Sequence, residues 1–273
     1  MRAYSWGLRE IRQGCTVGGV NLGFNFGGAL REVARTGLDL LLPPDALDGG
    51  PRPLTTGLSA EAWSRIEFID DPVCDGCGVP FPYSLGEGVR CPACYAKPRA
   101  FARARAACLY DEHSRDLILK LKHADRIDLS GLFARWLSRA AADLVEGADW
   151  IAPVPLHPLR LFSRRYNQSA EIARPLARLS GRAYAPDLLV RRRATGSQGG
   201  KSGRGRRINV QGAFEVPPRS AAKVAGRRIL LIDDVLTTGA TAEACARVLL
   251  AAGATAVDVA TIARVREAAS LSI

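Results

Sequence analysis

The stretch ILLIDDVLTTGAT, residues 229–241, guides the interpretation of the whole chain. Its first four residues, from Ile229 to Ile232, are apolar, and so short a run indicates a buried strand of a parallel sheet. Two adjacent carboxylates, Asp233 and Asp234, come next, and a loop of small hydroxylated residues follows them. The segment after the loop, ATAEACARVLLAAG, has a helical composition and ends at Gly253, as expected of a C′ glycine. The stretch therefore predicts a strand, a loop and a helix in succession.

This strand–loop–helix unit has the properties of a site for a phosphorylated sugar. Its loop consists of Thr237, Thr238, Gly239, Ala240 and Thr241. Backbone N–H groups at a helix N-terminus bind phosphate, and threonine hydroxyls add further donors. The carboxylates of Asp233 and Asp234 suit vicinal sugar hydroxyls or a nearby Mg²⁺. The alternative, an ordinary strand-to-helix turn with an aspartate N-cap, does not require two aspartates and three threonines at these positions.

Composition places the chain among proteins with anionic partners. The chain has 273 residues, and its 38 Lys and Arg against 27 Asp and Glu give a net charge of +11 and a pI near 9.7. This balance indicates phosphorylated metabolites, nucleic acid or a membrane surface as partners, although a GC-rich genome would also raise the arginine content. No apolar run approaches the ~20 residues of a membrane span, and charged residues interrupt any signal-peptide pattern. We therefore expect a cytoplasmic protein.

The N-terminal part carries little information. Residues 1–27 show no helical or strand period and are expected to be a flexible extension or an over-long start. Residues 28–42 place apolar residues on one face and predict an amphipathic helix that Pro43 and Pro44 end. With the Pro- and Gly-rich stretch after it, this helix makes residues 28–60 a helix-and-linker segment.

Four of the seven cysteines form two CxxC pairs. Cys74 and Cys77 are followed, after thirteen intervening residues, by Cys91 and Cys94. Each pair directs two thiolates at one point, and the intervening segment is long enough for a hairpin to bring the pairs together. This pattern predicts a four-thiolate structural Zn²⁺ site in a small module at residues 61–103. Unconnected thiols or a redox pair are the alternatives.

Residues 104–273 contain the remaining expected elements. Strands are expected at 104–110, 150–154 and 257–265, with Cys108 in the core. A helix with Ser114 as N-cap should run to about His123, and a second helix should span 128–147. His113 and His123 are expected to be solvated, because neither has an acid or cysteine partner at ligand spacing.

Two basic segments are candidates for phosphate contact. The loop after the expected strand 150–154 carries Arg160, Arg164 and Arg165 at the carboxyl edge of the sheet, where α/β proteins bind ligands. Residues 191–214 hold seven Lys and Arg and no acid. Their GGKS resembles the end of a P-loop, but Thr195 stands where the first glycine is needed. We interpret this segment as a mobile lid or a nucleic-acid contact; a solvated basic loop and a functionless disordered segment remain the alternatives.

Four features together resemble one known family. ILLIDDVLTTGAT resembles the phosphoribosyl-pyrophosphate (PRPP) motif of type I phosphoribosyltransferases. The cysteine pairs, PVPLHPLRLFSRRYNQ, the segment ending in RRINVQGAF and this motif follow one another as in the competence protein F (ComF or GntX) family. The resemblance covers about residues 38–266. It implies a twisted parallel sheet with helices on both faces and a small hood at residues 104–273, preceded by a zinc-ribbon-like module. Many relatives carry a further cysteine pair where this chain reads LLLPPDALDGG, so no second zinc is expected.

The resemblance also implies the roles of single residues. Asp233 and Asp234 would hold the ribose of PRPP, the loop 237–241 would hold its 5′-phosphate, and Mg²⁺ would assist. The side chains that would meet pyrophosphate or nucleic acid are Arg160, Arg164, Arg165, Lys201 and Arg204, and those that would contact nucleic acid are Arg206 and Arg207. The family is linked to single-stranded DNA uptake in natural transformation, so DNA and the uptake machinery are expected partners. Three functions stay open: transfer of phosphoribose to an unidentified acceptor, PRPP and DNA binding without turnover, and PRPP-dependent regulation.

Overall fold

The core is a five-stranded parallel sheet with the strand order β1-β7-β6-β2-β3. The computed structural model describes residues 46–48, 57–123, 126–193, 210 and 212–266. The expected extension at 1–27 and helix at 28–42 lie outside these residues. The strands are β1 (Ala104–Leu109), β2 (Trp150–Pro153), β3 (Ala183–Tyr184), β6 (Arg228–Leu236) and β7 (Ala256–Arg264). A separate antiparallel pair is formed by β4 (Val190–Arg191) and β5 (Phe214–Glu215).

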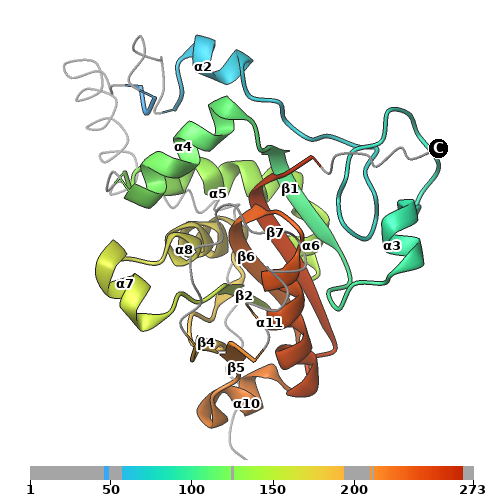
Figure 1. The fold of residues 1–273 in the computed structure, drawn as a ribbon, viewed down its shortest axis with the longest axis vertical. Helices are drawn as coiled ribbons and strands as arrows, with labels where there is room; N and C mark the ends of the chain where they lie inside the picture. Colours follow the sequence, from blue (N-terminus) through green and yellow to red (C-terminus); the bar gives the residue numbers. More distant parts are fainter. Residues whose placement is uncertain (1–45, 49–56, 124–125, 194–209, 211, 267–273) are drawn as a thin grey trace, which may run out of the picture. The chain divides into compact units, whose positions relative to one another are not determined.

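Helices cover both faces of the sheet (Figure 1). One layer consists of α4 (Glu112–His123), α5 (Leu129–Ala140), α6 (Ala142–Glu146) and α8 (Gln168–Ser180). The other contains α10 (Pro218–Val224), α11 (Ala240–Ala251) and the β4–β5 pair. Among the described residues, the short helices α2 (Ala60–Ser64) and α3 (Pro92–Ala96) precede β1, and α7 (Pro158–Arg164) precedes α8.

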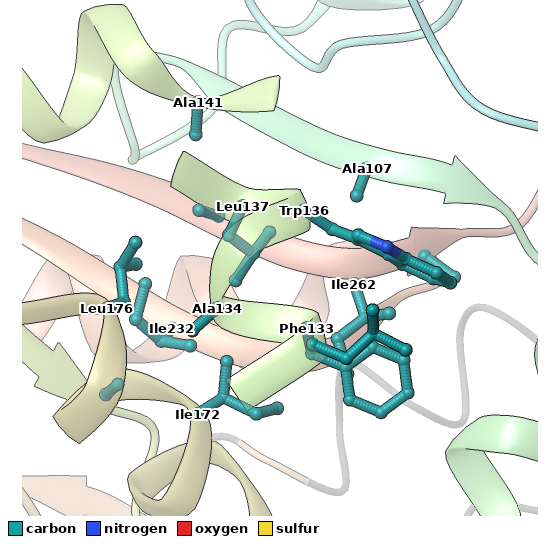
Figure 2. Packing of buried hydrophobic residues seen from close by; sticks show 14 of the residues in the cluster. Ala107, Phe133, Ala134, Trp136, Leu137, Ala141, Ile172, Leu176, Ile232 and Ile262 are labelled. Carbon is teal, nitrogen blue, oxygen red and sulfur yellow. The ribbon is translucent and has the colours of Figure 1, made fainter. Parts of the chain in front are cut away.

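The alternation of side chains along β6 divides the core into these two layers. Leu230 and Ile232 pack in the cluster that contains α5 and α8, whereas Ile229 and Leu231 pack in the cluster that contains α11. Successive side chains of a strand point to opposite faces, so a strand covered on both sides must be apolar throughout. In Figure 2, Phe133 and Leu137 of α5 lie with Ile232 in this first cluster.

Three elements differ from the sequence-based expectation. The strand at 229–232 continues through the acidic pair to Leu236, because the equally long β7 supplies backbone partners for the added residues. The expected helix at 128–147 is broken at Ala141, which leaves helical conformation with φ −123° and ψ 29°. Ser114 is not the N-cap of α4. Its N–H donates to Asp111 Oδ1 (2.8 Å) and its Oγ accepts from Asp111 N–H (3.0 Å), so Asp111 caps the helix.

The segment expected to be a proline-punctuated loop contains α7. His157 Nδ1 accepts from the Leu159 N–H (3.3 Å), and Pro158 occupies the first helical turn, where a proline is tolerated. The helix has no buried residue, and Phe162 is 90 % exposed. An amphipathic pattern was therefore absent, and this is why the sequence did not predict the helix. Within the described residues, no helix combines the length and apolar character that crossing a membrane requires.

Candidate functional site

A cleft of about 510 Å³ lies at the carboxyl ends of β2 and β6. In parallel α/β sheets ligands bind at this edge, because the loops after the strands and the helix N-termini meet there. The acidic pair and all five residues of the loop 237–241 line the cleft. Further side chains reach it from α4, α7, α8 and β4: Lys122, Arg160, Arg164, Gln168, Ser169 and Arg191.

The two carboxylates of the acidic pair have hydrogen-bond and ion-pair partners within the protein. Asp233 Oδ1 accepts from Ser169 Oγ (3.1 Å) and from the Asp234 N–H (2.9 Å). Asp234 Oδ2 lies 2.6 Å from Lys122 Nζ, and the two side chains are 19 % and 17 % exposed. Burial, and then the neighbouring charge of Asp234, raises the pKa of Asp233 to about 7. The pair is therefore not two free carboxylates: one is compensated by a lysine and the other takes up a proton near neutrality.

An arginine, Arg99, contacts the backbone of the loop after β6. Gly239 adopts φ 76° as N-cap of α11, and a β-carbon there would lie 3.5 Å from Arg99 Nη1 and from a ring atom of Phe101. Arg99 Nη1 donates to the Thr238 carbonyl (3.0 Å) and to Glu243 Oε1 (3.0 Å). Thr238 Oγ1 is buried and has no hydrogen-bond partner in the described part of the chain. An unsatisfied buried hydroxyl costs about 1–3 kcal/mol, so it favours a ligand that accepts from it.

The predicted basic residues separate into three groups. Arg160 and Arg164 line the cleft, and Arg164 Nη1 donates to Gln168 Oε1 (3.3 Å). Arg165 is exposed, caps the C-terminus of α7 with φ 66°, and is not among the cleft residues. The remaining predicted contacts lie outside the described residues: Lys201, Arg204, Arg206 and Arg207. The strands that flank their segment, β4 and β5, pair with each other.

The structure adds further cleft residues to those predicted from the sequence, among them Lys122, Gln168, Ser169 and Arg191. Arg191 was assigned to a mobile lid, but it is buried in β4, with its guanidinium carbon 5.3 Å from the Phe214 ring centroid. Burial, and then the charge of Arg160, lowers the pKa of Arg191. Lys122 lies in α4, and no pattern in the sequence around it indicates that its side chain reaches the cleft. Gln168 and Ser169 begin α8, whose Asn167 N-cap was a detectable signal that a helix N-terminus faces this edge.

The four cysteines of the CxxC pairs form one buried cluster. Their Sγ atoms all lie within 4.8 Å of one another, and Cys77 Sγ is 3.7 Å from Cys91 Sγ. Four thiolates about 2.3 Å from a tetrahedral Zn²⁺ would be separated by about 3.8 Å, so the residues fit a metal ion. A hydrogen bond from Cys77 lowers the pKa of Cys74 to about 4, and burial raises that of Cys94 to about 11. Four such groups require a cation to ionise together, and the cluster could hold a metal ion.

The cysteine module is joined to the cleft although the two are remote in sequence. The buried guanidinium of Arg264, at the end of β7, donates to the Cys77 carbonyl. Arg99 follows the second cysteine pair and bonds to the Thr238 carbonyl of the cleft loop. One arginine therefore links the cysteine module to the end of β7, and another links the segment after the module to the loop 237–241.

Comparisons with known proteins agree with the geometry. The family model described as Phosphoribosyl transferase domain matches residues 154–272. DNA utilization protein YhgH of Escherichia coli K12 is 33% identical over 202 residues, which cover 72% of this chain and 86% of that protein. Competence protein F of Haemophilus influenzae is 29% identical over 223 residues, covering 73% of this chain and 93% of the relative.

A third relative, competence protein ComFC of Streptococcus pneumoniae, is 28% identical over 211 residues, covering 77% of this chain and 87% of the relative. The predicted phosphoribosyltransferase fold is confirmed by the matched domain and by the parallel sheet with helices on both faces. The chain belongs to the family of competence protein F and DNA utilization protein YhgH, and its C-terminal part is a phosphoribosyl transferase domain.

Proposed function

We propose that the cleft at the ends of β2 and β6 binds PRPP with the assistance of Mg²⁺, in a protein that serves DNA uptake or utilization. The observation that carries the proposal is the presence of an acidic pair, a phosphate-type loop and two arginines around one cavity. The phosphoribosyl transferase domain and the names of the relatives support the same conclusion.

Each part of PRPP has a complementary group in the cleft. Asp233 and Asp234 accept hydrogen bonds from the ribose hydroxyls, and the loop 237–241 donates backbone and hydroxyl groups to the 5′-phosphate. Arg160 and Arg164 meet the pyrophosphate, for which guanidinium groups are suited. Arg165 does not line the cleft, so we do not assign it to the pyrophosphate. It remains a candidate contact for an anion bound outside the cleft. The selectivity for phosphoribose over free phosphate comes from the carboxylates, which repel a bare anion.

Transfer of the phosphoribosyl group needs no nucleophilic side chain. The anomeric carbon passes through a cationic state, and Mg²⁺, when bound, offsets the charge on the leaving pyrophosphate. The residues of the chain orient the ribose and hold the two phosphate ends apart. Pyrophosphate release in the presence of PRPP, Mg²⁺ and candidate bases tests for turnover; without it, the cleft acts as a PRPP-binding site in a competence factor or regulator.

The PRPP assignment is tested with the double variant Asp233→Asn/Asp234→Asn. Calorimetry with PRPP and Mg²⁺ should show at least about a tenfold weaker binding than for the wild type, since a charge-assisted hydrogen bond is lost. Asp187→Asn serves as the matched control, because this carboxylate pairs with Lys223 at the surface and is not among the cleft residues. Equal affinity of wild type and double variant for PRPP would refute the assignment.

The ion at the cysteine cluster is proposed to be a structural Zn²⁺ held by Cys74, Cys77, Cys91 and Cys94. The supporting observation is the closed set of four buried thiols, which leaves no protein position open for substrate. Elemental analysis of protein purified under reducing conditions without chelator should find about one zinc per chain. A Cys91→Ser protein with unchanged zinc content would contradict the ligand set.

Single-stranded DNA is the proposed macromolecular partner. The net charge of +11 and the names of the relatives support this partner, with Arg206 and Arg207 as contacts alongside Lys201 and Arg204. Affinity should fall by ~0.7 decades per decade of salt for every phosphate that is neutralised. Titration of a labelled oligonucleotide at several salt concentrations measures this slope. Binding that is insensitive to salt and unchanged by Arg206→Ala/Arg207→Ala would exclude these contacts.

A further inference from the structure

A second cleft, of about 590 Å³, shares no lining residue with the cleft at the strand ends. Its volume lies in the range of about 300–1,000 Å³ that is typical of ligand pockets. Its wall combines aromatic rings, arginines and aspartates: Trp63, Phe68, Trp136, Arg105, Arg135, Arg139, Asp70, Asp71 and Asp143. No role in PRPP binding or in the metal cluster accounts for this composition.

The cleft is formed where a chain segment covers the free edge of β1. Ile69 N–H donates to the Ala107 carbonyl (3.0 Å) and Leu109 N–H donates to the Glu67 carbonyl (2.9 Å), which places residues 67–69 beside the edge strand. The opposite wall is one face of α5, because Arg135, Trp136 and Arg139 are spaced by three and four residues. The cleft therefore lies between the segment beside β1 and α5.

Three aromatic rings, those of Trp63, Phe68 and Trp136, pack against one another in this cleft, two of the three pairs edge to face. The ring centroid of Phe68 lies 4.8 Å from that of Trp63 and 4.9 Å from that of Trp136. Trp63 and Trp136 meet edge to face at 6.0 Å. Trp63 nevertheless remains 45 % exposed, which is unusual for a tryptophan already engaged in an aromatic cluster. Part of the Trp63 surface is therefore accessible to a ligand.

Polar groups surround these three rings with both donors and acceptors. Trp136 is 6 % exposed, and its buried indole Nε1 has no hydrogen-bond partner in the described part of the chain. Asp70 and Asp71, which follow the segment beside β1, supply acceptors to the cleft. The Arg139–Asp70 ion pair (2.8 Å) is exposed at 70 % and 67 %, and a pair in water is weak enough to exchange for a phosphate.

We propose that this second cleft binds a nucleotide, with its base stacked on Trp63 and its phosphate at Arg135 or Arg139. A nucleobase matches the wall because it is planar and carries both donors and acceptors at its edge. Base–aromatic stacking with arginine nearby is the usual way in which proteins hold single-stranded nucleic acid. The same chemistry fits a free nucleotide and one unit of a DNA strand. The proposal does not depend on PRPP binding, because the two clefts have no residue in common.

The test compares Trp63→Ala with a control that removes another exposed ring. Tyr95→Ala is suitable, because Tyr95 is 84 % exposed on α3 and lines neither cleft. Binding is measured by calorimetry with dAMP and by fluorescence anisotropy with a labelled oligo-dA and with an abasic oligonucleotide of equal length. Loss of one stacking contact should weaken binding of base-containing probes at least about fivefold. The abasic probe should bind wild type and Trp63→Ala equally.

A second pair of variants tests the proposal independently, in case Trp63→Ala does not fold. Arg139→Ala should weaken dAMP and oligo-dA binding, whereas Arg178→Ala, an exposed arginine of α8, should not. An effect on dAMP and oligo-dA together indicates a site for the nucleotide unit, and an effect on oligo-dA alone indicates a site for the strand. The proposal is overturned if neither variant changes binding, or if only Asp233→Asn/Asp234→Asn abolishes it, since the nucleotide would then occupy the PRPP cleft.

Discussion

Lys122 Nζ lies 2.6 Å from Asp234 Oδ2, and this contact joins α4 to the strand that carries the acidic pair. Two adjacent carboxylates within β6 require compensation, and the segment 229–241 around them contains no cation. The lysine supplies it from a distant part of the chain. Its ammonium group also lines the cavity proposed to receive a polyanionic ligand.

Replacement of this lysine should weaken PRPP binding. Lys122→Met removes one positive charge from the cleft, and we expect PRPP affinity to fall about five- to tenfold in calorimetry at low salt. The same variant should raise the pKa of Asp233 further, because the charge of Lys122 lowers it. Lys120→Met is the matched control, since Lys120 is on the same helix but donates to the Asp48 carbonyl (2.9 Å). Comparable losses in both variants would argue against a specific role for Lys122.

Stability should depend on pH through Asp233. Its pKa is raised from 3.8 to about 7 in the folded protein, so the folded state retains a proton that the unfolded state releases. The free energy of unfolding should therefore decrease as pH rises from about 4 to about 7 and level off above that range. From pH 5 to pH 8 the titration of this carboxyl should lower the free energy of unfolding by about 1–3 kcal/mol. The lower value allows for the partial exposure of the carboxyl to water.

Urea unfolding of wild type and Asp233→Asn at pH 5 and pH 8 measures this effect. The variant should lose less stability than the wild type over this interval, because its amide does not titrate. Parallel pH profiles for the two proteins would show that Asp233 does not titrate in this range. PRPP binding by the wild type should strengthen over the same interval as the carboxylate forms.

Gly78, one residue after the first cysteine pair, should not tolerate a side chain. A β-carbon there would lie 2.5 Å from the Ala104 carbonyl oxygen, and the residue has φ +69°. Gly88 has the same φ but no atom within 4 Å, so Gly88→Ala isolates the conformational cost of about 1–2 kcal/mol. Gly78→Ala should lower the free energy of unfolding, measured with denaturant, by about 1–3 kcal/mol more than Gly88→Ala does, which is the cost of overpacking. Equal effects of the two substitutions would show that the module moves freely away from β1.

Removal of the proposed Zn²⁺ should weaken PRPP binding, although no cysteine is among the residues that line the cleft at the strand ends. The reason is that Arg264 holds the Cys77 carbonyl and Arg99 holds the Thr238 carbonyl, so a loosened module frees the phosphate loop. We expect Cys91→Ser to reduce PRPP affinity a few-fold, and Arg99→Met to do the same. In the double variant the two effects should be less than additive, as for residues in one contact network. Metal-free protein with the affinity of the metal-bound form would disprove the connection.

Much of the proposed phosphate site could be predicted from the sequence, because its determinants are local. The apolar run before Asp233, the glycine at position 239 and the glycine that ends α11 each act through neighbouring backbone atoms. Gly253 indeed has φ 95°, and the Ala254 N–H donates to the Leu249 carbonyl, as a C′ glycine requires. The spacing of the two CxxC pairs likewise sets their approach, and their four Sγ atoms cluster as predicted.

The tertiary structure decided what depends on distant segments. The sequence contains no signal that pairs Lys122 with Asp234, places Arg191 in the cleft, or brings Trp63 against Trp136. These contacts arise because parallel strands from separate parts of the chain end at one sheet edge, and because a segment before β1 covers the free edge of the sheet. Local pattern specified the strands, the loop and the cysteine pairs through short-range backbone chemistry. Packing of the sheet and its helices decided which charges and rings meet, since only the folded chain brings side chains of remote sequence within a few ångströms of each other.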